Sequence, residues 1–251
     1  MNFDFKHKTI LVTGSTEGLG FHIGKNLINL GATVIFNSRS NDKKQLEKLE
    51  GKKINHLTAD VSDFKQVKSM MKNINKEFGL LDHIVCNVGN GSSKKLNNGS
   101  FQELNLMFKK NLFPSSNIIS LAPDYMVREE ASIVCISSIC GIENIGAPTG
   151  YQVSKAALNM YVKSIAKHLY KFKIRINGIA PGNIFFENSV WDRKLKENKK
   201  EVLDMLKRDV IMNRLGTPEE IVNFVFFLLL PLSSFSTGQT FIVDGGQTKG
   251  L

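Results

Sequence analysis

The chain of 251 residues has the length of one large domain, and its 42% hydrophobic residues can form a substantial core. Its formal net charge of +10 favours phosphate-bearing ligands. Nucleic-acid binding is disfavoured, because the lysines are scattered and neither a helix-turn-helix nor a zinc pattern is present. A membrane span is excluded, because the longest apolar run, residues 224–230, is too short to cross a bilayer.

The three cysteines, Cys86, Cys135 and Cys140, have neither an even count nor the spacing of metal ligands. We therefore expect them to be reduced core residues. The first residues show no apolar stretch after a basic one, so no signal peptide is expected. Together these features predict a cytoplasmic protein.

The first predicted element is a short apolar strand at residues 9–13, which leads into a glycine-rich turn and a helix. Glycines let the backbone approach a diphosphate, and the helix N-terminus presents unpaired N–H groups to it. The turn is therefore expected to bind a dinucleotide. Its expected contacts are Gly14, Ser15, Thr16, Gly18, Leu19 and Gly20.

A second strand, residues 32–37, is followed by Ser38 and Arg39. An acidic residue near this strand end would bind the adenosine ribose hydroxyls of NAD, and none is present. A hydroxyl and a guanidinium instead suit the 2′-phosphate of NADP. The sequence thus favours NADP(H) over NAD(H), and the plain alternative is a surface arginine in a loop.

Between residues 42 and 126 the sequence alternates helical and extended patterns. The expected elements are a charged helix at 42–50, a strand at 54–59, a helix at 64–78, a strand at 81–86, a mobile loop at 90–100 and a long helix from Ser100 through Asn111 toward Met126. Ser62 or Asp63 would cap the helix at 64–78, and Ser100 would cap the long helix. Pro114 would disturb that long helix locally.

An apolar, β-branched run at residues 133–136 predicts a strand buried on both faces, and Ser138 follows it. A helical pattern then starts near Tyr151, and Lys155 lies on the same face one turn later. An ammonium about 4 Å from a phenol favours the phenolate by roughly 4 kcal/mol at an effective dielectric constant of about 20. Lys155 is therefore expected to lower the pKa of Tyr151 toward the working range of a general acid or base.

This reading of the Tyr151 helix has alternatives. A Tyr-x-x-x-Lys pair also arises by chance on amphipathic helices, and serines that end a strand often form only a turn. The helical pattern places several apolar residues on one side; they are Val153, Ala156, Ala157, Met160, Tyr161 and Ile165.

A further strand at 174–180 is followed by residues 183–215, which break the alternation and mix aromatic with charged residues. Insertions after a strand's carboxyl end commonly cover a ligand, so we expect short helices that form a substrate cap. The Thr-Pro-Glu-Glu sequence at 217–220 predicts a capped helix over 218–230. The last strand is expected at 240–243.

Seven strands that alternate with helices predict an α/β protein: a single doubly wound Rossmann domain over residues 1–251. We expect a seven-stranded parallel sheet, helices on both faces and the helical substrate cap at 183–215. Ligands bind at the carboxyl ends of such strands. The residues that follow such strand ends are predicted to share one site; they are the glycine turn, Arg39, Asp60, Asn87, Ser138 and Pro181-Gly182.

The chain resembles the short-chain dehydrogenase/reductase family over nearly its full length. The matching motifs are Thr13-Gly14-x-x-x-Gly18-x-Gly20, Asp60-Val61, Asn87-x-Gly89, Asn111, Ser138, Tyr151-x-x-x-Lys155, Pro181-Gly182 and Asp244-Gly245-Gly246. The resemblance implies that Tyr151 is the general acid/base and that Lys155 lowers its pKa and binds the nicotinamide ribose. It also implies that Ser138 polarises a substrate carbonyl and that Asn111 positions a water in a proton relay.

Further cofactor contacts implied by the resemblance are Asp60, Val61, Asn87, Gly89, Tyr151, Lys155, Pro181, Gly182 and Ile184, and the expected substrate contacts are Ser138, Tyr151, Phe185, Phe186 and Trp191. The chain departs from the family pattern in three places. Val88 replaces the usual alanine, and Phe186 replaces a threonine that would bind the nicotinamide amide. Residues 183–194 resemble a subgroup that includes sugar-modifying relatives.

These features predict an NADP(H)-dependent oxidoreductase that interconverts a ketone and a secondary alcohol, similar to 3-oxoacyl-acyl-carrier-protein reductases. One alternative is action on a sugar or sugar nucleotide in bacterial surface-glycan biosynthesis. An alternative of another class is a non-catalytic NADP-binding regulator. Because relatives commonly form tetramers, a homotetramer or homodimer is expected.

Overall fold

The computed structural model describes residues 3–91 and 99–250. They form a seven-stranded, wholly parallel sheet with the strand order β3-β2-β1-β4-β5-β6-β7. The strands are β1 (Thr9–Val12), β2 (Thr33–Ser38), β3 (Asn55–Thr58), β4 (His83–Cys86), β5 (Ala131–Ile136), β6 (Ile174–Pro181) and β7 (Thr240–Val243). The predicted doubly wound α/β fold is therefore confirmed, and the strand order reverses between β1 and β4, which is the point where ligands bind in such sheets.

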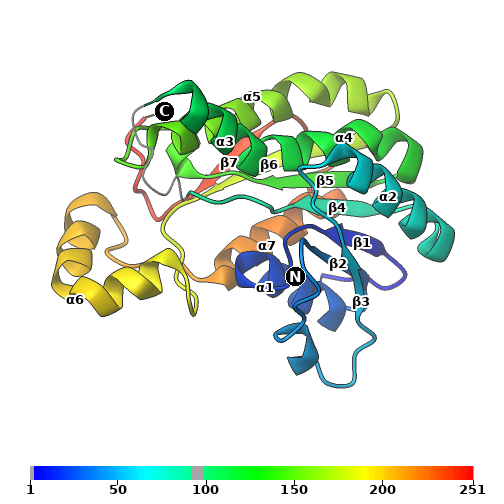
Figure 1. The fold of residues 1–251 in the computed structure, drawn as a ribbon, viewed down its shortest axis with the longest axis horizontal. Coiled ribbons are helices and arrows are strands. Elements are labelled where there is room, and N and C mark those ends of the chain that lie inside the picture. Colours follow the sequence, from blue (N-terminus) through cyan, green and yellow to red (C-terminus); the bar gives the residue numbers. More distant parts are fainter. Residues whose placement is uncertain (1–2, 92–98, 251) are drawn as a thin grey trace.

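The sheet is sandwiched between two layers of helices (Figure 1). The helices are α1 (Gly18–Asn29), α2 (Phe64–Phe78), α3 (Phe101–Asn111), α4 (Phe113–Tyr125), α5 (Thr149–Tyr170), α6 (Val190–Asp209) and α7 (Pro218–Leu229), and the short 3-10 turns are η1 (Leu46–Lys48), η2 (Ile139–Gly141) and η3 (Pro231–Ser233). Helices α1 and α7 cover one face, and α2, α4 and α5 cover the other. Each face buries its own apolar cluster.

Helix capping follows the sequence closely. Asp63 accepts hydrogen bonds from the backbone at the start of α2, and Ser100 accepts one at the start of α3. At α7, Thr217 and Glu220 form a reciprocal capping box. In residues 3–91 and 99–250 no helix combines the length and apolarity needed to cross a membrane.

Two expected elements differ in the structure, and a third cannot be compared with it. The prediction of a charged helix at 42–50 is wrong, because only the single turn η1 forms there. Leu46 and Leu49 are buried, and the charged residues between them are exposed. The long helix after Ser100 is two helices, and the break falls at Leu112, just before Pro114 enters the first turn of α4. The expected loop at 90–100 lies mostly outside the described residues.

The segment 183–215 holds one kinked helix, α6, instead of short separate helices. The backbone at Asn198 is non-helical, with φ −152° and ψ 81°, which divides α6 into two arms. Both arms project beyond the sheet (Figure 1). The Asn198 side chain accepts from the Glu201 backbone N–H, so this residue restarts the helix after the kink.

Helix α5 has apolar residues on more than one side. Val153 and Met160 are exposed, and the residues that α5 buries against the sheet include Leu158 and Val162. A helix between a sheet and a neighbouring helix commonly has this pattern. The exposed apolar side is available for contacts with another chain.

Candidate active site

Four of the residues expected to form one site follow the carboxyl ends of strands in the same sheet. Gly14 follows β1, Asp60 follows β3, Asn87 follows β4 and Ser138 follows β5. Since the strands are parallel and adjacent in the sheet, these ends share one edge. Tyr151 and Lys155 reach the same edge from the first turns of α5.

The glycine turn between β1 and α1 has the shape of a diphosphate cradle. Gly14 has φ +59°, a backbone conformation that residues with a side chain rarely adopt. A Cβ on Gly20 would collide with the backbone oxygen of Gly14 and would lie 2.5 Å from the Asn87 amide nitrogen. The turn therefore needs glycine at both positions, and it leads directly into the N-terminus of α1, which has no side-chain cap.

Two polar side chains hold this turn against the sheet. Asn87 donates from its side chain to the Gly14 carbonyl oxygen at 2.9 Å. The buried Ser15 hydroxyl donates to the Val12 carbonyl at 2.6 Å and accepts from the Asn37 backbone N–H at 3.0 Å. The Ser15 side chain thus fixes the turn, so a cofactor contact from this residue remains a prediction for its backbone.

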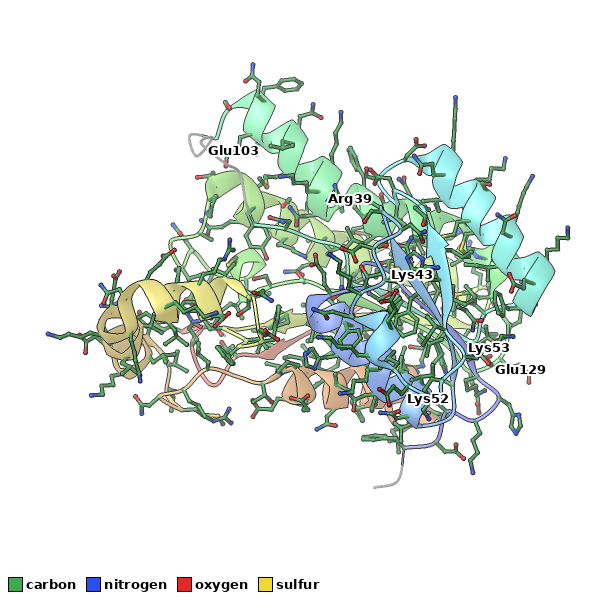
Figure 2. All side chains as sticks on the ribbon, turned by 60° about the horizontal axis from the view of Figure 1, so that its bottom comes forward. Arg39, Lys43, Lys52, Lys53, Glu103 and Glu129 are labelled. Carbon is green, nitrogen blue, oxygen red and sulfur yellow. The ribbon has the colours of Figure 1, made fainter. Side chains whose placement is uncertain are left out.

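The expected adenosine end of the site lies at β2 and β3. Arg39 is exposed directly after Ser38 (Figure 2). The Asp60 carboxylate accepts from the backbone N–H and the hydroxyl of Ser62, at 2.9 and 2.7 Å. Because these bonds orient Asp60, its second oxygen is held beside the end of β3, where an adenine is expected.

The Tyr151 phenol lies among Ser138, Cys140 and Lys155. Burial raises the pKa of Tyr151 to about 12; Cys140 adds to the rise, and a hydrogen bond with Ser138 opposes it. Burial also lowers the pKa of Lys155 to about 8. The Lys155 amine donates to the Ile136 carbonyl oxygen at 2.9 Å and lies 6.0 Å from the centroid of the Tyr151 ring.

The expected lowering of the Tyr151 pKa by Lys155 is therefore wrong for this structure. The expectation placed the two charges about 4 Å apart at an effective dielectric constant of about 20. In the structure both groups are desolvated, and burial favours the neutral form of each. A phenol with a raised pKa is protonated near neutral pH, which suits it as a proton donor.

Gly89 and Asn111 form the wall next to Lys155. A Cβ on Gly89 would lie 2.8 Å from the Lys155 nitrogen and 3.1 Å from the Asn111 side-chain oxygen. The Asn111 side chain accepts from the Asn90 backbone N–H at 2.8 Å and donates to the Met107 carbonyl at 3.0 Å. Asn111 thus fixes the segment after β4 against the end of α3. Its expected role with a water stays a prediction.

Glu103 is a residue that the sequence did not single out. Its carboxylate is fully buried, accepts from the backbone N–H of Gly150 at 2.8 Å and from that of Gly99 at 2.8 Å. Gly150 is in the first turn of α5, directly before Tyr151, and the N-cap residue of α5, Pro148, has no side chain that caps the helix. Glu103 therefore supplies acceptor oxygens at the N-terminus of the helix that carries Tyr151.

Replacing Glu103 by alanine is expected to lower the free energy of unfolding by about 2–4 kcal/mol, because the buried N–H of Gly150 and the partly buried N–H of Gly99 lose their acceptor. Glu103→Gln keeps one acceptor oxygen, so its free energy of unfolding should fall by about half as much as that of the alanine variant. Chemical denaturation of both variants measures the difference. An alanine variant as stable as the wild type would contradict this role of Glu103.

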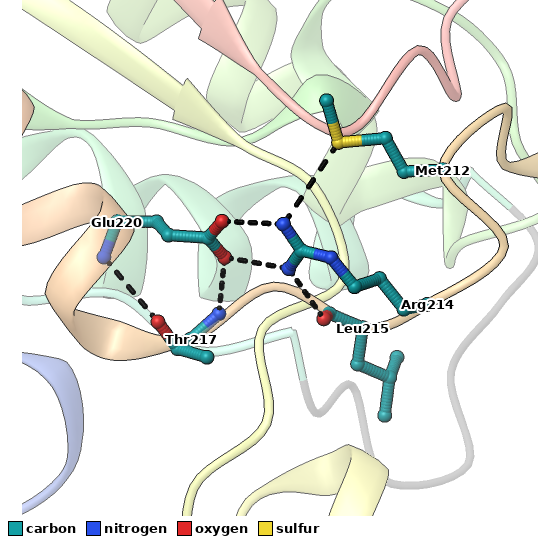
Figure 3. Close-up of polar contacts among 5 residues, drawn as sticks. All are labelled: Met212, Arg214, Leu215, Thr217 and Glu220. Carbon is teal, nitrogen blue, oxygen red and sulfur yellow. Dashed lines mark hydrogen bonds and ion pairs between the residues drawn. The ribbon is translucent and has the colours of Figure 1, made fainter.

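The cap is tied to the sheet at both of its ends. Ile184 pairs with Gly216 in a parallel bridge, so the chain enters and leaves the cap at the same place. Arg214 binds Glu220 through two hydrogen bonds of 2.9 and 2.6 Å, and Glu220 also accepts from the Thr217 backbone N–H (Figure 3). A cavity of about 130 Å³ lies next to this ion pair, at the ends of β6 and β7.

The aromatic residues expected to contact substrate lie in different surroundings. Phe186 lies against the glycine turn, since a Cβ on Gly18 would be 3.2 Å from its ring. Phe185 is exposed. Trp191 packs in a small apolar cluster within the cap, with the Lys194 ammonium 4.6 Å from its ring centroid. Substrate contacts from all three residues stay predictions.

Comparison with known proteins relates this geometry to characterised enzymes. A family model described as enoyl-(acyl carrier protein) reductase matches residues 14–248. A tropinone reductase homolog of Datura stramonium is 35% identical over 96% of this chain and 91% of its own length. A 3-oxoacyl-acyl-carrier-protein reductase of Chlamydia trachomatis is 32% identical over 96% of this chain and 97% of its own. The solved structure of L-sorbose reductase from Gluconobacter frateurii, complexed with NADPH and L-sorbose, has a TM-score of 0.90 and 26% identity, with both chains covered completely.

Proposed function

The chain belongs to the short-chain dehydrogenase/reductase family of oxidoreductases, and from this premise we propose that it is an NADP(H)-dependent enzyme that interconverts a ketone and a secondary alcohol. The observation that carries the proposal is the continuity of the site. Asn87 binds the glycine turn, and Gly89, two residues later, lies against Lys155. A dinucleotide in the turn would therefore reach the Tyr151 side of the site.

The residues present fit a dinucleotide. The glycine turn at Gly14 and Gly20 is closely packed and leads into the N-terminus of α1, which has no side-chain cap and so offers N–H groups to an anion. A bound nicotinamide supplies the hydride that reduces a carbonyl carbon. The protein's part is to bind, to orient and to move a proton.

In the reductive direction, the Tyr151 hydroxyl donates its proton to the carbonyl oxygen, which becomes the hydroxyl of the alcohol. The Ser138 hydroxyl donates a hydrogen bond to the same oxygen and so stabilises negative charge that develops on it. The tyrosinate left behind is reprotonated from solvent, and Lys155 is proposed to bind the nicotinamide ribose beside it. Residues 183–215 are proposed to cover the substrate during these steps.

For the substrate we propose a 3-oxoacyl thioester, as the similarity to the Chlamydia trachomatis reductase suggests. The similarity to L-sorbose reductase supports a ketose as the second candidate. NADPH oxidation should be followed with an acetoacetyl thioester and, separately, with a panel of ketoses and keto-sugar nucleotides. A kcat/KM at least about tenfold higher for the thioester supports the first class, and the reverse ratio supports the second.

The rival of another class is a non-catalytic regulator that binds NADP. The convergence of Ser138, Tyr151 and Lys155 supports an enzyme, because cofactor binding alone does not require a proton donor beside the dinucleotide. Tight NADPH binding without turnover of any ketone would support the regulator instead.

Replacing Arg39 by aspartate is expected to raise the KM for NADPH about 100-fold and to leave the KM for NADH within about threefold. A charge-assisted bond to a phosphate contributes about 1.5–3 kcal/mol, and repulsion from the new carboxylate adds to its loss. Steady-state kinetics with both cofactors measures the ratio. Arg128→Asp, an equal charge change at an exposed residue before β5, is the control. If Arg39→Asp weakens both cofactors equally, the proposed NADP preference is wrong.

We also propose that the chain assembles into a homotetramer or homodimer. Exposed apolar side chains on neighbouring helices support this, namely Phe101 on α3, Phe113 on α4 and Val153 and Met160 on α5. Such a group of side chains is typical of a surface that another chain covers. Sedimentation equilibrium tests the assembly, and a monomer at micromolar concentration would contradict it.

A further inference from the structure

Ser38 and His56 form a side-chain pair at the carboxyl end of β2. The Ser38 hydroxyl oxygen lies 2.9 Å from Nε2 of His56, on the neighbouring strand β3. The same hydroxyl donates to the backbone carbonyl oxygen of Ser40 at 2.5 Å. A carbonyl oxygen can only accept, so the single hydroxyl hydrogen is used there. The hydrogen of the other contact must therefore come from His56, which carries it on Nε2.

Positively charged side chains lie near this pair. The pKa of His56 is lowered mainly by burial and to a smaller extent by the nearby Lys43. The imidazole is therefore neutral near neutral pH and has one N–H to donate. Lys43 and Arg39 both project from the segment between β2 and η1 (Figure 2). An anion at this place would meet the Arg39 guanidinium, the Lys43 ammonium and the Ser38 hydroxyl.

The His56 contact also explains how Ser38 can serve an anion. A serine hydroxyl rotates freely, and an anion gains from it only when its hydrogen points outward. An N–H that donates to the serine oxygen from behind occupies one lone pair and makes the hydroxyl a stronger donor. When a phosphate oxygen replaces the Ser40 carbonyl as acceptor, the imidazole can keep its bond to the serine oxygen.

We propose that His56 is a positioning residue that directs the Ser38 hydroxyl to the 2′-phosphate and thereby helps the protein to distinguish NADPH from NADH. The inference rests on the proposed function, and it assigns a role in cofactor selection to a residue of β3. NADH has a hydroxyl in place of that phosphate, so the effect of His56 should be confined to NADPH.

The test is a series of variants at position 56, assayed for the KM of each cofactor. His56→Leu removes the donor and is expected to raise the KM for NADPH about fivefold to tenfold, with kcat and the KM for NADH within about twofold. His56→Gln can place an amide N–H near the position of Nε2 and should restore the KM for NADPH to within about threefold of the wild type. Lys52→Leu, at an exposed lysine of the loop before β3, is the control and should change neither KM.

A double-mutant cycle with Ser38→Ala separates positioning from general packing. If His56 acts through the Ser38 hydroxyl, then adding His56→Leu to the Ser38→Ala variant raises the KM for NADPH by less than about twofold. Independent, multiplicative effects would overturn the proposal, as would equal losses for NADPH and NADH. If the His56→Leu variant folds poorly, His56→Gln is compared with Ser38→Ala instead. A loss of NADPH selectivity in His56→Gln as large as that in Ser38→Ala would contradict the proposed N–H donor.

Failure of this inference differs from failure of the proposed function. If Arg39→Asp changes cofactor selectivity and His56→Leu does not, only the role of His56 is wrong. If the wild type turns over no ketone with either cofactor, the proposed function itself fails.

Discussion

Replacing Tyr151 by phenylalanine is expected to lower kcat about 10²- to 10⁴-fold while the dissociation constant for NADPH stays within about twofold. The phenol is the group next to Ser138 whose pKa, about 12, keeps it protonated and able to donate. Removing one oxygen atom leaves the ring and its packing in place. Turnover and fluorescence titration with NADPH measure the two quantities separately.

The matched control for this prediction is Tyr161→Phe. Tyr161 lies on the same helix, and burial raises its pKa to about 12 as well, but it packs against the apolar cluster of α2, α4 and α5. Removing the Tyr161 hydroxyl should leave kcat within about twofold of the wild-type value. A Tyr151→Phe variant that keeps more than about a tenth of the wild-type kcat would contradict the assignment of Tyr151 as proton donor.

Replacing Lys155 by methionine is expected to abolish turnover and to change how stability depends on pH. The pKa of Lys155 is about 8 in the folded protein against an ordinary value of 10.5, so between these values the unfolded chain binds one more proton than the folded protein does. Stability of the wild type therefore rises with pH in this window, by about 1.4 kcal/mol per pH unit and ~3 kcal/mol in total. Below about pH 8 the lysine is charged in both states and adds no slope.

Methionine cannot titrate, so the difference in unfolding free energy between wild type and Lys155→Met isolates the lysine from other groups that titrate at high pH. Urea denaturation of both proteins at several values between pH 7 and pH 10 measures this difference. Lys163→Met, at an exposed lysine on the same helix, should show no such slope relative to the wild type. A difference that is independent of pH would mean that the buried amine is not destabilised by its surroundings.

The sequence was most informative where one local cause sets the structure. The strand positions follow from apolar runs, and the caps at Asp63, Ser100 and Thr217 follow from side chains that bond to the adjacent backbone. The spacing of Tyr151 and Lys155 follows from helix geometry alone. These features needed no knowledge of distant contacts.

The sequence was least informative where contacts between distant parts of the chain determine the local structure. The charged segment at 42–50 has the composition of a helix, but two buried leucines hold it as a turn against the sheet. The pKa of Tyr151 depends on burial by the whole site, which a spacing of four residues does not report. Glu103 had no signal in the sequence, because its carboxylate binds the backbone of α5, 47 positions away.

Two further roles also had no local signal. His56 is a single histidine in a short strand, and only the pairing of β2 with β3 brings it to Ser38. Trp191 stands among charges in the sequence, and the kink at Asn198 turns the second arm of α6 so that Val202 and Leu206 pack with it. Both positions depend on how elements fold back on one another.

The most direct measurement of the proposed activity is the transfer of deuterium from NADPH labelled at the reactive carbon of the nicotinamide. The wild-type protein should be incubated with this cofactor and either an acetoacetyl thioester or a ketose, and the alcohol analysed by mass spectrometry. One deuterium on the former carbonyl carbon is the expected result for at least one of the two substrates. Binding of the labelled cofactor with no labelled alcohol from either substrate would contradict the proposed enzyme.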